Sequence, residues 1–384
     1  MPRSTAPADP RSTAHANPRS TAHAGYGPAS AVAKMVAWHR NVTERYVKLA
    51  VIGATGAVGE MILRVLDERN VALSELGAFA SRDRDEPLRF RGRDVPIRKA
   101  VPAALAGYDV VMFASSDDAS AELAEQCVAG GAIVIDNSAT FRMDSRVPLV
   151  IPEINASAAR PDDRIFPVAN CTAIVLAMGI APIARVAGLR SVRVASYQAV
   201  SGAGRAGLDE LAAGERALAD GTPEPEPRTF STAIARNVIP QVGSFDEHGD
   251  SGEERKVAEE TRKILGLPGL HVAATTVRVP VRTAHSEAVF LETERDASVA
   301  DLAAAYRDAP GVVFHARGIV TPRDVEGSDD VHVARLRAEG GSRRHFQLWV
   351  VGDQLRKGAA TNAVQILEML LAQGRVRSGG LQHA

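Results

Sequence analysis

A strand-like run that leads directly into a glycine-rich turn and a helix is the feature that most restricts the fold. The apolar run Tyr46-Val-Lys-Leu-Ala-Val-Ile52 is followed at once by Gly53-Ala-Thr-Gly-Ala-Val-Gly59, and a helical pattern then runs from Met61 to Leu66. Strand, glycine turn and helix in this order are the fingerprint of a dinucleotide-binding domain. Glycine motifs also occur in ordinary turns, so the remaining sequence has to decide between the two interpretations.

Each glycine of this turn has a distinct expected task. Gly53 permits the tight turn, Gly56 lets backbone N–H groups approach a pyrophosphate, and Gly59 lets the helix pack close to the strand. The residues of the turn that we expect to contact a cofactor are Gly53, Thr55, Gly56, Ala57, Val58 and Gly59.

The end of the second expected strand bears on which nicotinamide cofactor would bind. The strand Leu76 to Ala80 is followed by Ser81 and Arg82, where a lone acid would select NAD. An arginine and a hydroxyl group suit a 2′-phosphate and therefore predict NADP. Asp83 follows directly, which leaves NAD open as the alternative.

Further apolar runs extend the predicted nucleotide-binding sheet. The runs Asp109 to Ala114 and Ala132 to Asp136 are separated by a helical stretch from about 118 to 128. Apolar strands that alternate with helices are typical of a parallel sheet covered on both faces. Polar residues end these strands at the edge where such sheets bind ligands, but Ser116 or Asp117 could equally cap the following helix, and capping is the favoured interpretation.

A cysteine at the start of an apolar helical run is the candidate nucleophile. The stretch Phe166 to Met178 places Asn170 and Cys171 at the beginning of this run. In the first turn of a helix the partial positive charge of the N-terminus favours thiolate over thiol. The alternative is that Cys171 is a small buried apolar residue, which is common for free cysteines.

The second half of the chain changes to an alternating strand pattern. Val192 to Val200 runs into a second glycine loop, Ser201-Gly-Ala-Gly204, and later strands carry Arg278 and His285. These later strands predict an antiparallel sheet with one covered face. A final helical run at about 358–372 could return to pack on the first domain.

A helix that begins at Ser251 carries two further candidate residues. Ser251 with Glu254 three positions later forms a capping box, which gives Glu254 a structural task. Glu253 and Lys256 lie three apart on one face of this helix and are free for another role, although most such pairs are simply solvated.

Composition narrows the classes of function. A formal net charge of -1 gives no electrostatic reason to expect nucleic acid or an acidic membrane as partner. No apolar run reaches the roughly 18 residues that a membrane span needs. Cys127 and Cys171 are the two cysteines of the chain, too few for a disulfide framework or a zinc site, so we expect a reducing cytoplasm and no metal.

The first 45 residues differ from the rest of the chain. Pro2-Arg-Ser-Thr-Ala6 recurs at Pro10 and Pro18 as a polar unit with nothing to pack. We expect residues 1–45 to be a disordered low-complexity extension, and Met35 to be the functional start.

The motifs together resemble the aspartate-semialdehyde dehydrogenase family, over roughly Val47 to Leu371. The matching segments are Gly53-Ala-Thr-Gly-Ala-Val-Gly59, Asn170-Cys171-Thr172, Gln198 with Ser201-Gly-Ala-Gly204, Arg278-Val-Pro-Val, His285-Ser-Glu, and Gly352-Asp-Gln-Leu-Arg-Lys-Gly-Ala-Ala360. The resemblance implies that Cys171 is the nucleophile, that His285 is the acid/base, and that Gln198 orients the intermediate. Thiolate attack on an acyl phosphate, followed by hydride reduction of a thioester, needs residues of these types.

The resemblance also implies a set of binding residues. Arg278 would hold the substrate carboxylate and Glu253 its amino group, beside Asn170. Arg142 and Lys256 would bind phosphate, although Arg142 taken alone is more simply a solvated charge. On the cofactor side the resemblance adds Ser201, Gly202 and Gln354.

The expected fold is α/β, with a Rossmann-type NADP-binding domain at 46–171 and an α+β catalytic and dimerisation domain at 172–357. The second domain would contain a mixed or antiparallel sheet and form a homodimer. The implied reaction is NADPH-dependent conversion of L-aspartyl-4-phosphate to L-aspartate 4-semialdehyde, with inorganic phosphate as a partner, on the route to lysine and diaminopimelate, threonine and methionine. The alternatives are N-acetyl-glutamyl-phosphate reductase, against which Glu253 speaks, and an inactive NADP-binding paralogue.

Overall fold

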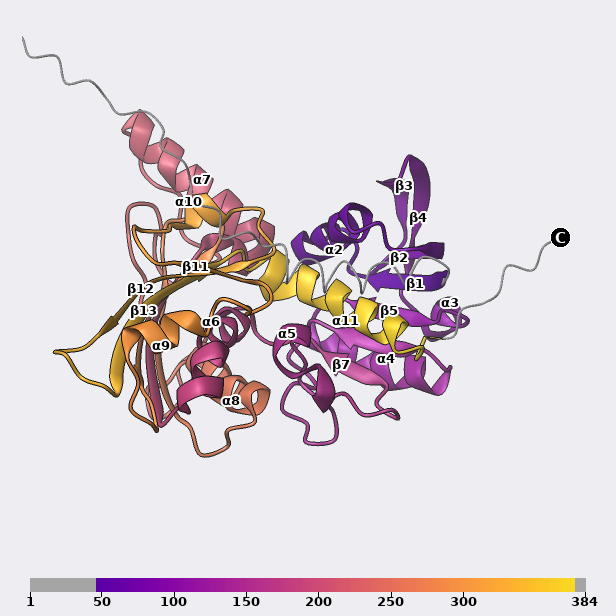
Figure 1. The fold of residues 1–384 in the computed structure, drawn as a ribbon. Helices are drawn as coiled ribbons and strands as arrows, with labels where there is room; N and C mark the ends of the chain where they lie inside the picture. The colour runs from indigo at the N-terminus through magenta and orange to yellow at the C-terminus, as the bar shows by residue number, and fades with distance from the viewer. Residues whose placement is uncertain (1–45, 377–384) are drawn as a thin grey trace, which may run out of the picture.

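The computed structural model describes residues 46–376 and contains two β-sheets side by side, one from each half of the chain (Figure 1). The extension at 1–45, for which we expect disorder, lies outside the described residues. Across the described range no helix combines the length and apolar character needed to cross a bilayer.

The first sheet has seven strands in the order β3-β4-β2-β1-β5-β6-β7. All of its neighbouring pairs are parallel except β3/β4, which is antiparallel. Their bounds are β1 Val47–Ile52, β2 Leu73–Ala80, β4 Arg93–Lys99, β5 Val110–Phe113, β6 Ile133–Asp136 and β7 Ile165–Pro167.

Helices cover both faces of the first sheet, as expected for parallel strands that are apolar on both sides. Apolar residues of α2 (Ala57–Glu68) and α11 (Thr361–Ala372) join one buried cluster, and those of α4 (Asp117–Ala129) and α3 (Pro102–Leu105) join the other. Ser116 caps α4 by accepting a hydrogen bond from Ala119 N, which confirms the capping interpretation.

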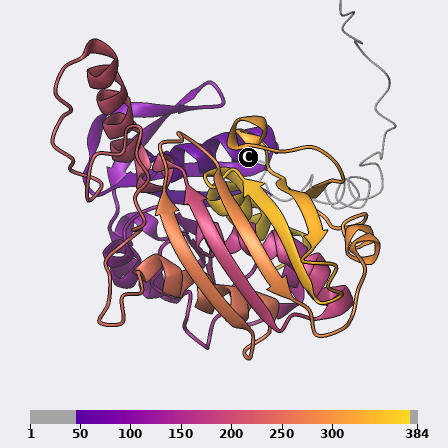
Figure 2. The same ribbon diagram turned by 90° about the vertical axis from the view of Figure 1, so that its left-hand side faces the viewer.

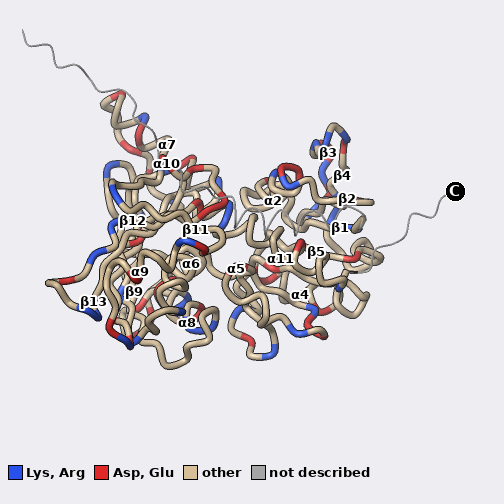
Figure 3. Tube along the Cα trace, viewed as in Figure 1, with Lys and Arg blue, Asp and Glu red and all other residues tan. Residues whose placement is uncertain are grey.

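A hairpin that the sequence reading did not predict forms one edge of this sheet. Strand β3 (Arg84–Phe90) pairs antiparallel with β4 across the turn at Arg91 and Gly92, whose φ angles are +48° and +77°. Two consecutive positive φ angles match the turns that fit the twist of a hairpin. Its many charged residues, visible in Figure 3, mask the alternation of Leu88, Phe90 and Ile97.

The second sheet has six strands in the order β11-β12-β13-β10-β8-β9 and is mixed, within the expectation. The pairs β8/β9 and β11/β12 are parallel, and the others are antiparallel. The strand bounds are β8 Ser191–Gln198, β9 His271–Arg278, β10 His285–Glu292, β11 Val312–His315, β12 Val331–Ala338 and β13 His345–Gly352.

The two faces of the second sheet differ. Helices α6 (Cys171–Ala187), α8 (Gly252–Leu265) and α9 (Val299–Ala304) lie on the face toward the first domain. Figure 2 looks onto the opposite face of this sheet. The alternation of buried and exposed residues along β8 and β10 turns Tyr197 and Phe290, 39% and 42% exposed, to that face. Aromatic side chains exposed on one open sheet face are typical of an interaction surface.

The remaining elements connect the sheets. Helix α11 follows the short π-helix η3 (Arg356–Ala360) and contacts α2 and β6, so the end of the chain packs on the first domain. The other elements are α5 Pro152–Asn155, η1 Ala156–Ala158, η2 Val200–Ala203, α7 Gly204–Asp220 and α10 Pro322–Val325.

Candidate active site

The glycine turn between β1 and α2 is packed too closely to accept side chains. A Cβ on Gly53 would lie 2.2 Å from the Ala114 carbonyl oxygen, and a Cβ on Gly59 would lie 2.2 Å from the Gly53 carbonyl oxygen. In the described structure no side chain caps α2 at Gly56, so the first N–H groups of this helix remain available to an anion. The turn therefore fits a dinucleotide pyrophosphate.

The segment after β2 presents a cation to solvent. Ser81 and Arg82 are both exposed directly beyond the strand. The Asp83 carboxylate accepts a hydrogen bond of 2.7 Å from Lys99 N, so this acid is engaged by the backbone of β4. Asp83, the acid that kept NAD as an alternative cofactor, therefore makes a hydrogen bond within the protein.

Cys171 is the first residue of α6, as the sequence pattern indicates. The side-chain oxygen of Asn170 caps this helix by accepting hydrogen bonds from Thr172 N at 3.0 Å and Ala173 N at 3.1 Å. A Cβ added to Gly358 would lie 3.0 Å from the Cys171 Cβ, so η3 forms a wall beside the thiol.

The protonation state of the thiol differs from the expectation drawn from the helix end. Burial and, to a smaller extent, the nearby Glu253 carboxylate raise the pKa of Cys171 to about 12, although Arg142 and Arg278 both act to lower it. Desolvation of the charged form therefore outweighs the helix N-terminus in the ligand-free site. A cationic substrate group that neutralised Glu253 would favour the thiolate.

Glu253 is the centre of a buried hydrogen-bond network beside Cys171. Its Oε1 accepts from Asn170 Nδ2 at 3.0 Å and from Gln198 Nε2 at 3.3 Å. Gln198 Nε2 also donates to Thr172 Oγ1 at 2.7 Å. Sequence reasoning did not single out Thr172, although it adjoins Cys171, because its partners in this network lie on other elements.

Arg278, Gln198 and His285 come from three adjacent strands and form one row on the inner face of the second sheet. Gln198 lies opposite Arg278 in the β8/β9 register, and the β8/β10 register places His285 beside Gln198. The structure therefore brings together three site residues that the sequence separates by up to 87 positions.

His285 has one defined hydrogen bond and one free ring nitrogen. Its Nδ1 accepts from Ala199 N at 3.1 Å, so the neutral ring carries its proton on Nε2. Nε2 is buried and has no hydrogen-bond partner among the described residues. Burial, with Arg278 adding to it, holds the pKa of His285 well below its usual value, so the ring is neutral and presents an N–H donor.

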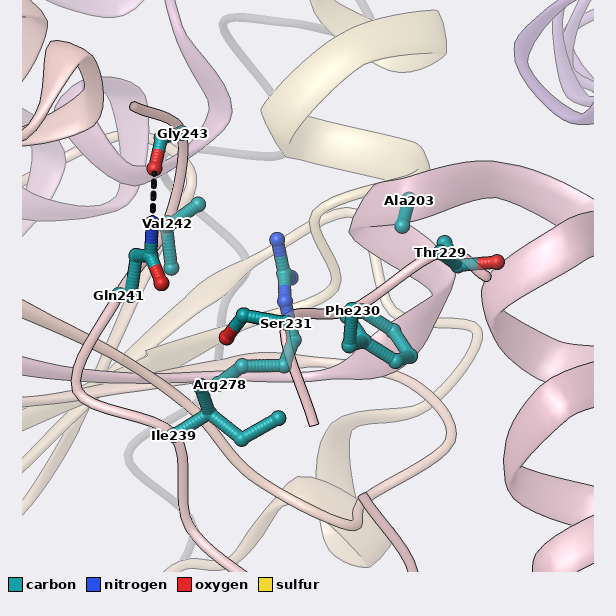
Figure 4. A pocket seen from close by; sticks show the side chains of 9 residues that line it. All are labelled: Ala203, Thr229, Phe230, Ser231, Ile239, Gln241, Val242, Gly243 and Arg278. Carbon is teal, nitrogen blue, oxygen red and sulfur yellow. Dashed lines mark hydrogen bonds between the residues drawn. The ribbon is translucent and has the colours of Figure 1, made fainter. Parts of the chain in front are cut away.

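Arg278 lines a pocket of about 340 Å³ (Figure 4). Its Nη1 donates to the Ala199 carbonyl at 2.7 Å, and its guanidinium lies 5.7 Å from the centre of the Phe230 ring. Phe230, Ser231 and Gln241 surround it in the pocket, on the loop that follows α7. A fixed guanidinium at the wall of a small pocket is suited to a carboxylate.

Arg142 is 9% exposed and forms a second cationic site. Its Nη2 donates to the Asn137 carbonyl at 2.7 Å and its Nη1 to Glu260 Oε1 at 3.3 Å, whereas within 46–376 its buried Nε has no acceptor. The solvated-charge interpretation is therefore wrong for Arg142. Lys256 lies half-buried on α8, one turn before Glu260.

The predicted cofactor residues of the second domain lie near the row formed by Arg278, Gln198 and His285. Gln354 donates through Nε2 to Ser201 Oγ and accepts from Ala284 N at 2.8 Å. A Cβ on Gly202 would lie 3.3 Å from His285 Nε2. The pair Arg205 and Glu60, at 2.9 Å, connects α7 with the first turn of α2.

Comparison with known families agrees with this two-domain organisation. Residues 48–161 match the model "Semialdehyde dehydrogenase, NAD binding domain", and residues 180–357 match "Semialdehyde dehydrogenase, dimerisation domain". Both domains of a semialdehyde dehydrogenase, a class of oxidoreductase, are thus present in the chain.

Individual relatives narrow the family. The chain is 39% identical to aspartate-semialdehyde dehydrogenase of Bacillus subtilis, over 85% of this chain and 98% of the relative, and 37% identical to that of Aquifex aeolicus, over 86% and 99%. The crystal structure of aspartate semialdehyde dehydrogenase II from Vibrio cholerae superposes with a TM-score of 0.82 at 37% identity, covering 85% of this chain and 99% of that one. The chain belongs to the aspartate-semialdehyde dehydrogenase family.

Proposed function

We propose that this protein catalyses the NADPH-dependent reductive dephosphorylation of L-aspartyl-4-phosphate to L-aspartate 4-semialdehyde. The observation that carries the proposal is that Cys171 lies near two separate cations, Arg278 and Arg142. Each of them acts to lower the pKa of its thiol. A substrate with an anion at each end and a reactive carbonyl between them fits this arrangement. The product would feed the synthesis of lysine and diaminopimelate, threonine and methionine.

The amino-acid end of the substrate would bind between two opposite charges. Arg278 would hold the carboxylate through its fork, in the pocket that it lines. Glu253, 9% exposed beside Asn170, would pair with the ammonium group. This pairing would neutralise the charge that raises the pKa of Cys171, so binding of the correct substrate would favour the reactive thiolate.

The chemical step begins at Cys171. Its thiolate would attack the acyl carbon, forming a carbon–sulfur bond while the carbon–oxygen bond to phosphate breaks and the electron pair leaves with phosphate. Arg142, through its free Nε–H, and Lys256 would receive the departing anion. Gln198, fixed by Thr172 and Glu253, would orient the resulting thioester.

His285 would act on the carbonyl oxygen of the thioester. When bound, NADPH supplies the hydride that reduces this group. The Nε2–H of His285 would donate to the oxygen as negative charge develops there, which is the acid half of the expected acid/base role. Collapse of the tetrahedral carbon would then release the aldehyde and return the thiolate.

The cofactor in this proposal is NADP. The uncapped start of α2 would receive the pyrophosphate, and Ser81 and Arg82 would bind the 2′-phosphate. Ser201, Gly202 and Gln354 would face the nicotinamide end, because Gly202 lies beside His285.

Replacing Arg82 by alanine tests this cofactor assignment. We expect NADP binding to weaken by about 1.5 to 3 kcal/mol, the range for hydrogen bonds to charged groups, and NAD binding to change little. Titration of both cofactors against the wild type and the variant measures the difference. Equal losses for NAD and NADP would show that Arg82 has only a structural role.

We also propose a cytoplasmic homodimer. The open face of the second sheet, with its exposed Tyr197 and Phe290, would form the subunit interface. Two free cysteines, Cys127 and Cys171, are compatible with a reducing compartment.

The assay that tests the function runs the reaction in reverse. Purified protein should reduce NADP when L-aspartate 4-semialdehyde and phosphate are both present, and should not do so without phosphate. Turnover of N-acetyl-glutamate semialdehyde in its place would favour the related reductase, whose acylated nitrogen offers no charge to Glu253. No turnover of either aldehyde would favour an inactive paralogue.

A further inference from the structure

We infer that Glu260 is a positioning residue that fixes the phosphate-binding Arg142 relative to the backbone carrying the nucleophile. The inference rests on the proposed function in so far as it takes Arg142 to be the phosphate ligand. Glu260 does not touch the thiol, and it would act on the reaction through its two hydrogen-bond partners.

The carboxylate of Glu260 bridges two parts of the site. It is 1% exposed, its Oε2 accepts from Asn170 N at 2.5 Å, and its Oε1 accepts from Arg142 Nη1 at 3.3 Å. Asn170 immediately precedes Cys171 and caps α6. One side chain therefore holds both the turn that presents the thiol and the guanidinium that would receive the leaving group.

The hydrogen bonds of Arg142 show which of its nitrogen atoms Glu260 holds in place. Nη1 and Nη2 are occupied by Glu260 and the Asn137 carbonyl, and Nε is the donor left open. From the same face of α8, Lys263 Nζ donates to the Arg142 carbonyl at 2.7 Å and the Asp144 carbonyl at 2.8 Å. Helix α8 thus holds Arg142 at its side chain and at its backbone.

This geometry matters because the acyl carbon must lie between the attacking sulfur and the departing phosphate. A misplacement of about 1 Å in such an arrangement can cost on the order of 10²-fold in rate. Arg142 reaches the site from a loop that follows β6, whereas Cys171 begins a helix of its own. Because Glu260 accepts hydrogen bonds from both elements, it fixes the position of Arg142 relative to the start of α6.

The principal test is Glu260→Gln, which keeps one acceptor oxygen but turns an amide N–H₂ toward one former donor. In the reverse reaction we expect the apparent KM for phosphate to rise about tenfold and kcat to fall on the order of tenfold to a hundredfold. The KM for semialdehyde should stay within about twofold, because Arg278 and Glu253 are untouched. The matched control is Glu259→Gln, an exposed neighbour on α8 whose kinetics should equal the wild type.

A double-mutant cycle separates positioning from general damage. If Glu260 acts through Arg142, then Glu260→Gln in an Arg142→Ala background should raise the KM for phosphate no further. Additive effects in this cycle, or equal rises in the KM for phosphate and for semialdehyde, would overturn the inference. If Glu260→Gln does not fold, Glu260→Asp keeps the charge but shortens its reach to Arg142 Nη1 and Asn170 N, and should raise the phosphate KM selectively; an unchanged KM would overturn the inference.

Alkylation of Cys171 by iodoacetamide gives a readout that does not depend on the reaction. Glu260→Gln removes a negative charge beside the start of α6, so labelling at pH 8 should become about twofold faster or more. If the wild type showed no phosphate-dependent turnover, the proposed function would fail, yet this change in labelling would still report the contact between Glu260 and the nucleophile turn. Identical labelling rates in both proteins would refute that contact.

Discussion

Replacement of Cys171 by serine is expected to reduce turnover by on the order of 10⁴-fold or more, while the affinity for NADP stays nearly unchanged. A hydroxyl group at this position is a far weaker nucleophile than a thiolate, and Cys171 belongs to α6 and not to the predicted pyrophosphate turn. Steady-state rates in both directions and direct cofactor titration measure the two quantities. Substantial turnover by the serine variant would remove the covalent mechanism.

The pH dependence of thiol labelling in the wild-type protein tests the protonation state of Cys171 independently of turnover. Because burial and Glu253 hold the pKa of Cys171 at about 12, the thiolate fraction should rise about tenfold per pH unit across the neutral range. Labelling of ligand-free protein should therefore accelerate steeply between pH 7 and 9. Cys127, whose pKa burial raises to about 11, is only 6% exposed on α4, so Cys171 should be labelled first.

Replacement of Arg278 by alanine should lower kcat/KM for the semialdehyde by on the order of 10³-fold, since it removes a bidentate charged contact. Arg278→Lys should restore little of this activity. A single ammonium group cannot reproduce the two parallel donors of the guanidinium, which contacts Ala199 and Phe230. Kinetics with phosphate and semialdehyde varied in turn measure the effect.

Lys256→Ala is the comparison for the Arg278 variant. It should raise the apparent KM for phosphate, and high phosphate should partly rescue it, because phosphate takes part in the reaction. Phosphate should not rescue Arg278→Ala, whose defect is mispositioning of the amino-acid end. Rescue of Arg278→Ala together with no rescue of Lys256→Ala would mean that the two anion sites had been assigned the wrong way round.

The sequence was sufficient for the fold class and for the local features that depend on neighbouring residues. The glycine turn, the helix start at Cys171 and the capping box of Ser251 with Glu254 all follow from short-range geometry, and the structure contains each of them. The motifs around Cys171, Arg278 and His285 could be matched to a family because they combine chemically specific residues in a fixed order along the chain.

Other features depend on contacts that no local pattern encodes. Glu260 and Thr172 gain their roles from partners on distant elements, and the sequence marks them only by their proximity to Glu253 and Cys171. The raised pKa of the Cys171 thiol is likewise a consequence of burial, which the helix-end argument alone could not anticipate. The β3–β4 hairpin was missed because its exposed charges obscure its alternation.

The chain passes between its two domains twice, once from β7 to Cys171 and once through η3 to α11. These two passages meet, because a Cβ on Gly358 would lie 3.0 Å from the Cys171 Cβ. If the first domain swings to admit or release its cofactor, the pivot therefore runs beside the sulfur atom. Atoms near a pivot move least, so the thiol would keep its place while atoms of the first domain moved in proportion to their distance from it.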